Sequence, residues 1–183
     1  MHLHEITPPE FDVDLFIAYA TAGNFTGNPV YKKPLCYLHP DAALCLKKAI
    51  KLAAPLGLRF KIFDAFRPQE AQEALWAHTP DPDFVADPKR GSNHTRGVAI
   101  DLTLTDSSGK ELDMGTAFDA FTPLSFHAVT DIPLEAQKNR LMLLGIMTAA
   151  GWNLNKNEWW HYQLFHAESY PLLRDSELGL GMM

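Results

Sequence analysis

Residues 98–105 constrain the fold more than any other segment, because two kinds of side chain alternate along them. The aliphatic residues Val98, Ile100, Leu102 and Leu104 alternate with Ala99, Asp101, Thr103 and Thr105. Side chains of a β-strand point alternately to its two faces, so this pattern predicts a strand with one aliphatic face. Asp101 is then on the opposite face, and His94 lies just before the strand.

The remaining segments predict an α+β fold. Two further strands are expected, over residues 58–63, which also alternate, and over residues 159–164, which are rich in aromatic side chains. Helices are expected over residues 41–56, 68–76 and 133–150. Because helices are interspersed with the strands, we expect a central, mainly antiparallel sheet flanked by helices.

Single residues predict the ends and the buried faces of these helices. Asp41 is the expected N-cap of the first helix, and Pro68 is the expected first residue of the second. Gly57 and Gly151 are the expected stops of the first and third helices. The expected buried stripe of the first helix consists of Leu44, Ile50 and Leu52 with the alanines among them, and one face of the third helix carries Leu141, Leu144 and Met147 or Thr148.

Composition narrows the class of protein. The 183 residues suit one domain spanning 1–183, and 46% hydrophobic with 21% charged residues is ordinary for a globular chain. A net charge of −6 without a basic run argues against a nucleic-acid partner. We recognise no signal peptide and no long apolar segment, so we expect a cytoplasmic protein with no membrane partner. Cys36 and Cys45 are then expected to be reduced thiols.

Two short segments bring together the residue types of a catalytic metal site. The first starts at Ser92, reads S-x-H-x-x-G-x-A-x-D, and contains His94 and Asp101; the second begins with Glu158 and ends with His161. Two imidazoles and one carboxylate are a usual ligand set for catalytic zinc, which keeps a fourth position for water. Zinc lowers the pKa of such a water to about 7. The sequence therefore predicts one zinc ion per chain, bound by His94, Asp101 and His161.

Glu158 and Arg67 complete the predicted chemistry. A water that attacks a peptide bond needs a proton acceptor, and Glu158 is the candidate because it lies three residues before the ligand His161. The negative charge that develops on the carbonyl oxygen needs a cation or hydrogen-bond donors. Arg67 lies at a junction between a strand and a helix, where an arginine can be held rigidly.

These segments resemble the D-alanyl-D-alanine dipeptidase family, which includes the vancomycin-resistance dipeptidases. The resemblance spans roughly residues 19–170. Its motifs are Tyr19-Ala20-Thr21 followed by Asn24-Phe25-Thr26-Gly27, Asp64-Ala65-Phe66-Arg67-Pro68, Ser92 to Asp101, Ala99 to Leu104, Met114-Gly115 with Phe118-Asp119, and Glu158 to Tyr162. An ordered set at compatible spacing is more specific than any single motif.

The resemblance implies hydrolysis of D-Ala-D-Ala to two D-alanines, on a fold shared with D,D-carboxypeptidases and the hedgehog signalling domain. It places zinc on His94, Asp101 and His161, the catalytic base at Glu158, and an arginine that stabilises the transition state at Arg67. It also implies three positions that engage the ends of the substrate, namely Asp119, Ser92 and Tyr19. An aspartate suits the free ammonium group of a dipeptide.

One connection departs from the vancomycin-resistance members of the family. Those members carry a longer insertion between the positions of Arg67 and His94, whereas the connection here, residues 76–83 and onward, is short, as in other chromosomal relatives. The resemblance therefore does not predict how strictly the pocket excludes longer peptides.

Three other interpretations stay open at the level of the sequence. A D,D-carboxypeptidase or peptidoglycan peptidase uses the same metal site, but it lacks a trap for a free ammonium and is usually exported. A non-catalytic zinc module has no use for Glu158 and Arg67, and a structural zinc normally has four protein ligands. An acidic binding protein without zinc needs none of these residues. The metal-binding residues together with Glu158, Arg67 and Asp119 favour the dipeptidase. Its role would be cell-wall precursor turnover or glycopeptide resistance.

Overall fold

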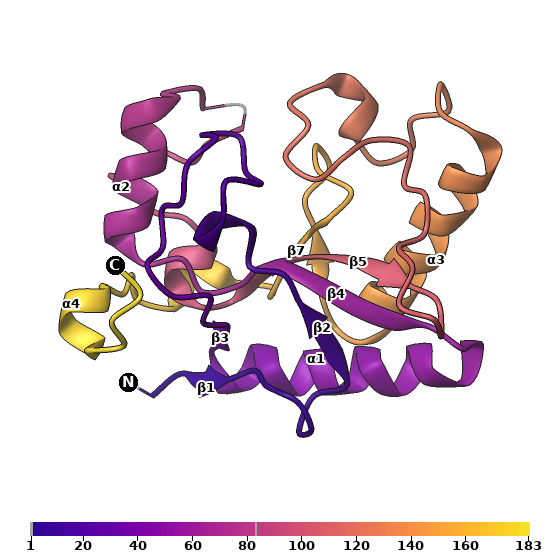
Figure 1. The fold of residues 1–183 in the computed structure, drawn as a ribbon, viewed down its shortest axis with the longest axis horizontal. Coiled ribbons are helices and arrows are strands. Elements are labelled where there is room, and N and C mark those ends of the chain that lie inside the picture. Colours follow the sequence, from indigo (N-terminus) through magenta and orange to yellow (C-terminus); the bar gives the residue numbers. More distant parts are fainter. Residues whose placement is uncertain (1, 83) are drawn as a thin grey trace.

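The computed structural model describes residues 2–82 and 84–183, so Met1 of the expected domain and Asp83 of the short connection lie outside the described residues. The fold is α+β, as expected (Figure 1). Its helices are α1 Pro40–Ala53, α2 Gln69–His78, α3 Leu134–Ala149 and α4 Asp175–Leu178. Its strands are β1 His4–Glu5, β2 Val13–Leu15, β3 Tyr37–Leu38, β4 Arg59–Asp64, β5 Ala99–Thr105, β6 Asn153–Leu154 and β7 His161–Gln163.

Five strands form the main sheet, in the order β2-β4-β5-β7-β6. Strands β2 and β4 are parallel, and the other neighbouring pairs are antiparallel, which confirms the expected sheet. Strands β1 and β3 form a separate antiparallel pair. The sequence did not predict β2 or β6, because strands of two or three residues are too short to show a period.

Helices α1 and α3 contact each other, and α1 also contacts the central strand β4 while α3 contacts the central strand β5. Figure 1 shows α1 along the lower side of the sheet, while the segments that follow α2 and β5 rise on its upper side. The aliphatic set of β5 packs in the core together with Phe60 and Ile62 of β4, and all of these residues are fully buried. Because both faces are covered, β5 is buried along its whole length, including Asp101.

All three predicted helices begin one residue away from their predicted starts, and α3 begins at Leu134 with Pro133 as its N-cap. Helix α1 begins at Pro40, and His39 rather than Asp41 is its N-cap, because the Nδ1 atom of His39 accepts a hydrogen bond from the Asp41 N–H at 3.2 Å. Asp41 lies in the first turn instead, where its charge interacts favourably with the helix dipole. Pro68 is likewise the N-cap of α2 and not its first residue.

The predicted buried face of α1 is wrong at Leu44 and Leu52 and right at its alanines, while Ile50 is half-buried against the core. Leu44 is 59% exposed, and Leu52 is also exposed. The buried residues are small apart from one leucine: Ala42, Ala43, Leu46, Ala49 and Ala53. This alanine face lets the helix approach its neighbours closely, and Leu44 remains at the surface because it lies about 200° around the helix from Leu46.

The predicted face of α3 is wrong at Leu141, which is 65% exposed, whereas Leu144 is half-buried against the core and, of the alternatives Met147 and Thr148, Met147 is the buried one. The buried residues of this helix are Ala136, Asn139, Arg140, Leu143, Ile146 and Met147. Two of them, Asn139 and Arg140, are polar. The prediction relied on the spacing of hydrophobic residues, and polar residues on the buried face interrupt that spacing.

Truncation of Leu143 and of Leu141 should therefore have very different effects on stability. Leu143→Ala leaves a cavity in the core and is expected to lower the free energy of unfolding by about 2–5 kcal/mol. Leu141→Ala, two residues earlier on the exposed side, should change it by about 0.5 kcal/mol or less. Urea unfolding followed by circular dichroism measures both. Equal losses in the two variants would contradict the orientation of α3.

The two cysteines are free thiols, Cys36 buried and Cys45 half-buried. Burial raises the pKa of the Cys36 thiol well above its usual value, so this thiol stays protonated and unreactive. Among the described residues, no helix is both long enough and apolar enough to cross a membrane.

Candidate active site

Three adjacent strands carry the centre of the site. Asp101 of β5 pairs with Asp64 on one side and with His161 of β7 on the other. Residues paired across strands share a face of the sheet, so these three side chains project together from the face opposite the aliphatic core. The register between β4 and β5 shifts between Ile62 and Asp64, an irregularity of the kind that often re-aims a side chain beside an active site.

His94 reaches the same point from a single turn of 3-10 helix, His94–Arg96, that precedes β5. The chain turns into the strand through Gly97, whose φ of +70° favours glycine. A Cβ atom at this position would lie 2.9 Å from a methyl carbon of Leu3 and 3.3 Å from the backbone nitrogen of His39. The glycine in the motif is thus required by the close approach of the N-terminal segment.

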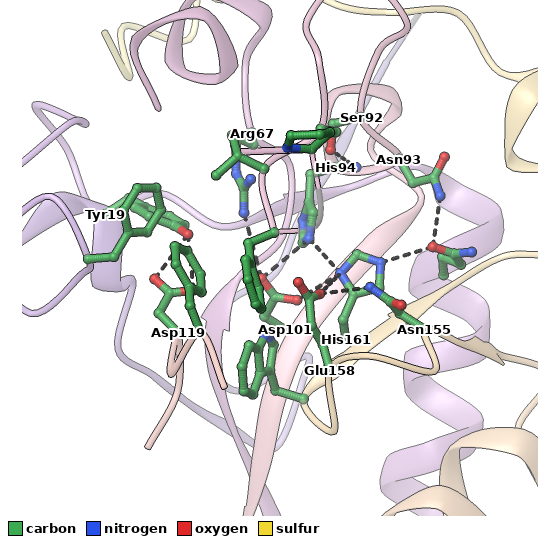
Figure 2. Close-up of a pocket in the computed structure, with 18 of the residues that line it drawn as sticks. Tyr19, Arg67, Ser92, Asn93, His94, Asp101, Asp119, Asn155, Glu158 and His161 are labelled. Atoms are coloured by element: carbon green, nitrogen blue, oxygen red, sulfur yellow. Dashed lines mark hydrogen bonds and ion pairs between the residues drawn. The ribbon is translucent and has the colours of Figure 1, made fainter. Parts of the chain in front are cut away.

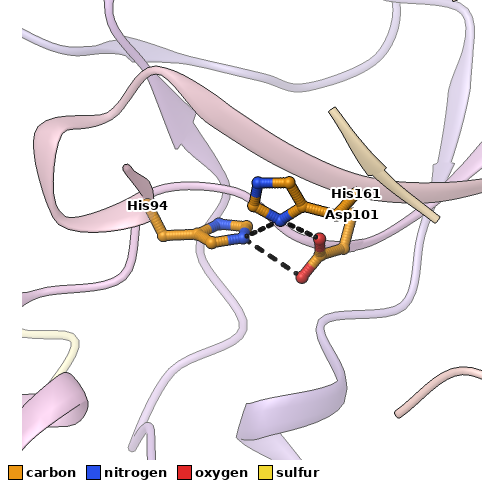
Figure 3. A group of neighbouring side chains, drawn as sticks. All are labelled: His94, Asp101 and His161. Carbon is orange, nitrogen blue, oxygen red and sulfur yellow. Dashed lines mark hydrogen bonds and ion pairs between the residues drawn. The ribbon is translucent and has the colours of Figure 1, made fainter. Parts of the chain in front are cut away.

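The structure brings His94, Asp101 and His161 together, with their ligand atoms within 4.8 Å of one another (Figure 3). The Nε2 atom of His94 and the Nδ1 atom of His161 are 3.0 Å apart. The Asp101 carboxylate lies 3.0 Å from Nδ1 of His161 and 3.3 Å from Nε2 of His94. Tetrahedral ligands at about 2.1 Å from a zinc ion are about 3.4 Å apart, so the buried group could hold a metal ion.

The outer nitrogens of both imidazoles define which atoms face the metal position. The Nδ1–H of His94 donates to the Ala65 carbonyl oxygen at 2.7 Å. The Nε2–H of His161 donates to Oε1 of Gln163 at 2.9 Å, and Asn93 donates to the same oxygen at 2.7 Å. When both rings are neutral, the lone pairs of Nε2 of His94 and Nδ1 of His161 then face each other, and their repulsion is relieved either by a metal cation between them or by a proton that is donated to Asp101. The donor set fits zinc, including the second hydrogen bond that a histidine ligand usually makes.

The charges in this cluster shift the pKa values of its members. Burial raises the pKa of Asp101, but the charge of His94 and hydrogen bonds from both histidines outweigh burial and hold this pKa far below its usual value. Burial lowers the pKa of His161, and the hydrogen bond and charge of Asp101 outweigh it and raise this pKa. The cluster therefore favours positive charge at the point where its ligand atoms converge.

Glu158 lies beside the metal position, in the turn before β7. Its Oε2 atom is 3.7 Å from Nδ1 of His161 and accepts a hydrogen bond from the side chain of Asn155 at 2.9 Å. Burial raises the pKa of Glu158, and the positive charge of His161 only partly opposes this. A carboxylate with a raised pKa is a better proton acceptor near neutral pH.

Arg67 is fixed by contacts on several sides. Its Nε donates to Asp64 at 2.9 Å, and one terminal nitrogen donates to the Gln72 side chain at 3.1 Å. The other terminal nitrogen points to Asp101 at 3.7 Å, and the guanidinium lies 4.7 Å from the centre of the Tyr19 ring. These contacts hold Arg67 at the junction between β4 and α2.

Asp119 and Tyr19 lie together to one side of the metal position (Figure 2). The Tyr19 hydroxyl donates to the Asp119 carboxylate, at 3.1 Å to the nearer oxygen. Asp119 has a left-handed backbone with φ of +58°. Burial, followed by the negative charge of Asp101, raises the pKa of Asp119 to about 8. Ser92 accepts a hydrogen bond from the backbone N–H of His94 at 3.2 Å.

The raised pKa of Asp119 predicts a dependence of stability on pH. An aspartate in an unfolded chain has a pKa of about 3.9, so the folded chain binds more protons than the unfolded chain between that value and about 8. The contribution is fully present below the unfolded pKa and is lost as pH rises through the folded pKa. In the metal-free protein, Asp119→Asn should therefore reduce the loss of unfolding free energy between about pH 5 and about pH 9.

Denaturant unfolding of the metal-free protein at these two pH values measures this effect. Asp131→Asn, which removes an exposed carboxylate, is the matched control and should leave the loss unchanged. An unaltered loss in Asp119→Asn would contradict the assignment.

All eight predicted site residues line one cavity of about 220 Å³ (Figure 2). Drug-sized ligands occupy about 300–1,000 Å³, so this cavity suits a smaller molecule. Aromatic rings from three segments line it as well: Phe121 stacks on Phe84 at 4.6 Å between ring centres and lies 5.0 Å from Phe25. Phe84 belongs to the short connection before His94, so that connection contributes to the wall.

Several residues that hold the site were not predicted individually. Asp64 and Gln72 fix Arg67, Asn155 fixes Glu158, and Gln163 fixes His161. A signal existed for Gln163, because it lies two residues after His161 and thus on the same face of β7. Asp64 lies within a recognised motif, three residues before Arg67. For Asn155 and Gln72 the sequence offers no period or motif.

Comparisons with known proteins agree with this geometry. A family model described as D-ala-D-ala dipeptidase matches residues 2–175. The chain is 48% identical over 164 residues to the D-alanyl-D-alanine dipeptidase of Escherichia coli (strain K12), a match that covers 90% of this chain and 85% of the relative. It is 34% identical over 174 residues to the protein of the same name from Enterococcus faecium, covering 84% and 86% of the two chains.

A third relative, the D-alanyl-D-alanine dipeptidase of Streptomyces coelicolor, is 34% identical over 170 residues, which cover 80% of this chain and 83% of the relative. The family model and these relatives each extend over most of the chain, and the residues that the family model matches include the whole metal cluster. The chain therefore belongs to the D-Ala-D-Ala dipeptidase family of metallopeptidases.

Proposed function

We propose that this chain is one zinc-dependent dipeptidase domain, which hydrolyses D-alanyl-D-alanine to two D-alanines. The observation that carries the proposal is the cavity that joins a buried metal-binding cluster, Glu158, Arg67 and Asp119 in a space suited to a small molecule. Membership of the dipeptidase family and the names of the relatives support the choice of substrate.

His94, Asp101 and His161 would hold one zinc ion per chain. When bound, zinc supplies Lewis acidity that polarises a peptide carbonyl and makes a water molecule acidic near neutral pH. Gln163 and the Ala65 carbonyl oxygen keep the two imidazoles oriented for this role, because each accepts the outer N–H of one ring.

Glu158 transfers a proton from the attacking water to the leaving group. In the proposed mechanism its carboxylate accepts a proton from the attacking water and later gives it to the nitrogen of the leaving D-alanine. Burial raises the pKa of Glu158 and Asn155 holds one of its oxygens, so the group is both basic and oriented.

Arg67 stabilises the negative charge that develops on the carbonyl oxygen of the scissile bond. Its guanidinium is already held by Asp64, Gln72 and the Tyr19 ring, so little reorganisation is needed as that charge appears.

Asp119, Tyr19 and Ser92 bind the ends of the dipeptide in this proposal. The Asp119 carboxylate pairs with the substrate ammonium, whose positive charge favours ionisation of a group that burial otherwise keeps protonated. The rings of Phe25, Phe84 and Phe121 stand near this end of the cavity and oppose a peptide extended beyond its N-terminus. The preference for a free dipeptide follows from both features.

The cytoplasm is the proposed location, because D-Ala-D-Ala is a free dipeptide there before it enters the wall precursor. Hydrolysis of this pool would serve precursor turnover or glycopeptide resistance.

A substrate panel tests the proposal. The zinc-loaded protein is assayed with D-Ala-D-Ala, N-acetyl-D-Ala-D-Ala and L-Ala-L-Ala, and D- and L-alanine release is measured. We expect turnover of the free D,D dipeptide and at least about 100-fold lower kcat/KM for the acetylated one, since acetylation leaves the buried Asp119 without a cation. Preference for the acetylated substrate would instead establish a D,D-carboxypeptidase. Zinc binding without turnover would indicate a binding module.

A further inference from the structure

Arg140 of α3 is a buried cation outside the cavity. It is 5% exposed, and its guanidinium is bound almost entirely by backbone oxygens. Its Nε donates to the Met114 carbonyl at 2.7 Å, and one terminal nitrogen donates to the carbonyls of Leu124 and Phe126 at 2.9 and 3.2 Å. Among residues 2–82 and 84–183, no carboxylate forms an ion pair with it.

Burial of the Arg140 charge without a carboxylate partner is energetically unfavourable. Burial lowers the pKa of Arg140, which means that the protein environment disfavours the charged form relative to water. A buried charge needs compensating hydrogen bonds, and here they come from three carbonyl groups of one connecting segment. The guanidinium is a rigid fork, so it fixes the positions of all three oxygens relative to one another.

These oxygens belong to the two ends of the segment that carries Asp119. Met114 lies before Asp119, and Leu124 and Phe126 lie after it. Asn139, the residue before Arg140 on α3, adds a bond to the Asp113 carbonyl at 2.9 Å. The two adjacent side chains of α3 thus hold both ends of residues 113–126, here called the Asp119 segment.

The Asp119 segment is also joined to the residue after the catalytic base. Trp159 donates its backbone N–H to the Ser125 carbonyl at 3.0 Å and its ring N–H to the Thr116 hydroxyl at 2.8 Å. The Arg140 guanidinium lies 5.8 Å from the centre of the Trp159 ring and 3.4 Å from the same Thr116 hydroxyl. One buried network therefore connects the position of Asp119 with that of Glu158.

We propose that Arg140 is a positioning residue for substrate recognition: by holding both ends of the Asp119 segment, it sets the distance between the Asp119 carboxylate and the catalytic centre. The inference rests on the proposed function, because it assumes that Asp119 binds the substrate ammonium. A shift of the carboxylate weakens binding of the dipeptide more than it slows the bond cleavage, which depends on Glu158, Arg67 and the metal cluster.

Steady-state kinetics of Arg140→Lys test the proposal. This substitution keeps the charge but cannot reach three carbonyls, and we expect KM for D-Ala-D-Ala to rise about tenfold or more while kcat per bound zinc changes less than about threefold. In the Asp119→Asn background the same substitution should raise KM less than about twofold, because the group it positions is already gone. Lys138→Gln, on the exposed side of the same helix, is the control and should leave both constants unchanged.

A merely structural role for Arg140 predicts different results. In folded, zinc-loaded protein it would lower kcat with KM unaltered, or it would change KM by the same factor in both backgrounds; either result overturns the proposal. Should Arg140→Lys fail to fold, Thr116→Val tests the same network, because it removes the hydroxyl that joins Arg140 to Trp159. It should raise KM by about threefold in the parent and leave it unchanged in Asp119→Asn.

Hydrogen exchange provides a readout that does not depend on hydrolysis. In Arg140→Lys, amides of the Asp119 segment should exchange faster while those of α1 keep their rates. Unchanged exchange in this segment would overturn the proposal. The parent protein is assayed beside the variants, and a parent that leaves D-Ala-D-Ala intact contradicts the proposed function and not the tethering of the segment.

Discussion

Replacement of Glu158 by glutamine is expected to lower kcat for D-Ala-D-Ala by about 10²–10⁴-fold while zinc stays at one ion per chain. Glutamine has the same length and can still accept the hydrogen bond from Asn155, so the substitution removes basicity and little else. Without a carboxylate, the attacking water has no proton acceptor beside the metal position. D-alanine release and zinc content, measured on the same preparation, give both quantities.

Glu168→Gln is the matched control, because the Glu168 side chain is exposed and lies outside the cavity. It should retain the activity of the parent. A Glu158→Gln variant that keeps most of its activity would contradict the assignment of the catalytic base. If that variant also lost its zinc, Glu158 would have to be counted among the metal ligands.

Replacement of His161 by alanine should abolish both zinc binding and hydrolysis. His161 supplies one of three ligand atoms, and its Nδ1 lies 3.0 Å from both His94 and Asp101. Loss of an outer partner of such a ligand already lowers metal affinity by about 10–100-fold, so loss of the ligand itself should lower it further. After dialysis against a chelator and back into zinc, we expect the variant to contain much less than one equivalent.

His166→Ala is the control for this experiment. Its side chain is 87% exposed and five residues further along the chain, so zinc content and activity should both match the parent. Stoichiometric zinc in His161→Ala would contradict the proposed ligand set, and loss of zinc in His166→Ala would indicate that the ion binds elsewhere.

The sequence predicted those parts of the site whose residues belong to a regular alternation of side chains or to a recognisable motif. Alternation along residues 98–105 placed Asp101 on the polar face of a strand, and the structure confirms that position. The order of the strands could not be predicted in the same way. Asp64 and His161 become neighbours of Asp101 only through the pairing of β4 and β7 with β5, and pairing between distant segments leaves no local pattern in the sequence.

Packing explains the predictions that were wrong. Leu44, Leu52 and Leu141 were expected to be buried because they are large and apolar, yet all three are exposed. Helix α1 packs through its alanines and one leucine, and α3 buries Asn139 and Arg140. A buried arginine that binds backbone carbonyls has no partner that a sequence can reveal, since every residue carries a carbonyl. The network around the Asp119 segment was therefore visible only in three dimensions.

Titration of the metal-free protein with zinc, followed by D-alanine release from D-Ala-D-Ala, tests the central claim most directly. The account predicts that the rate rises in proportion to zinc, levels off at one equivalent per chain, and yields two D-alanines for each dipeptide consumed. Absence of D-alanine release at every zinc level, or release at the same rate without zinc, would contradict it.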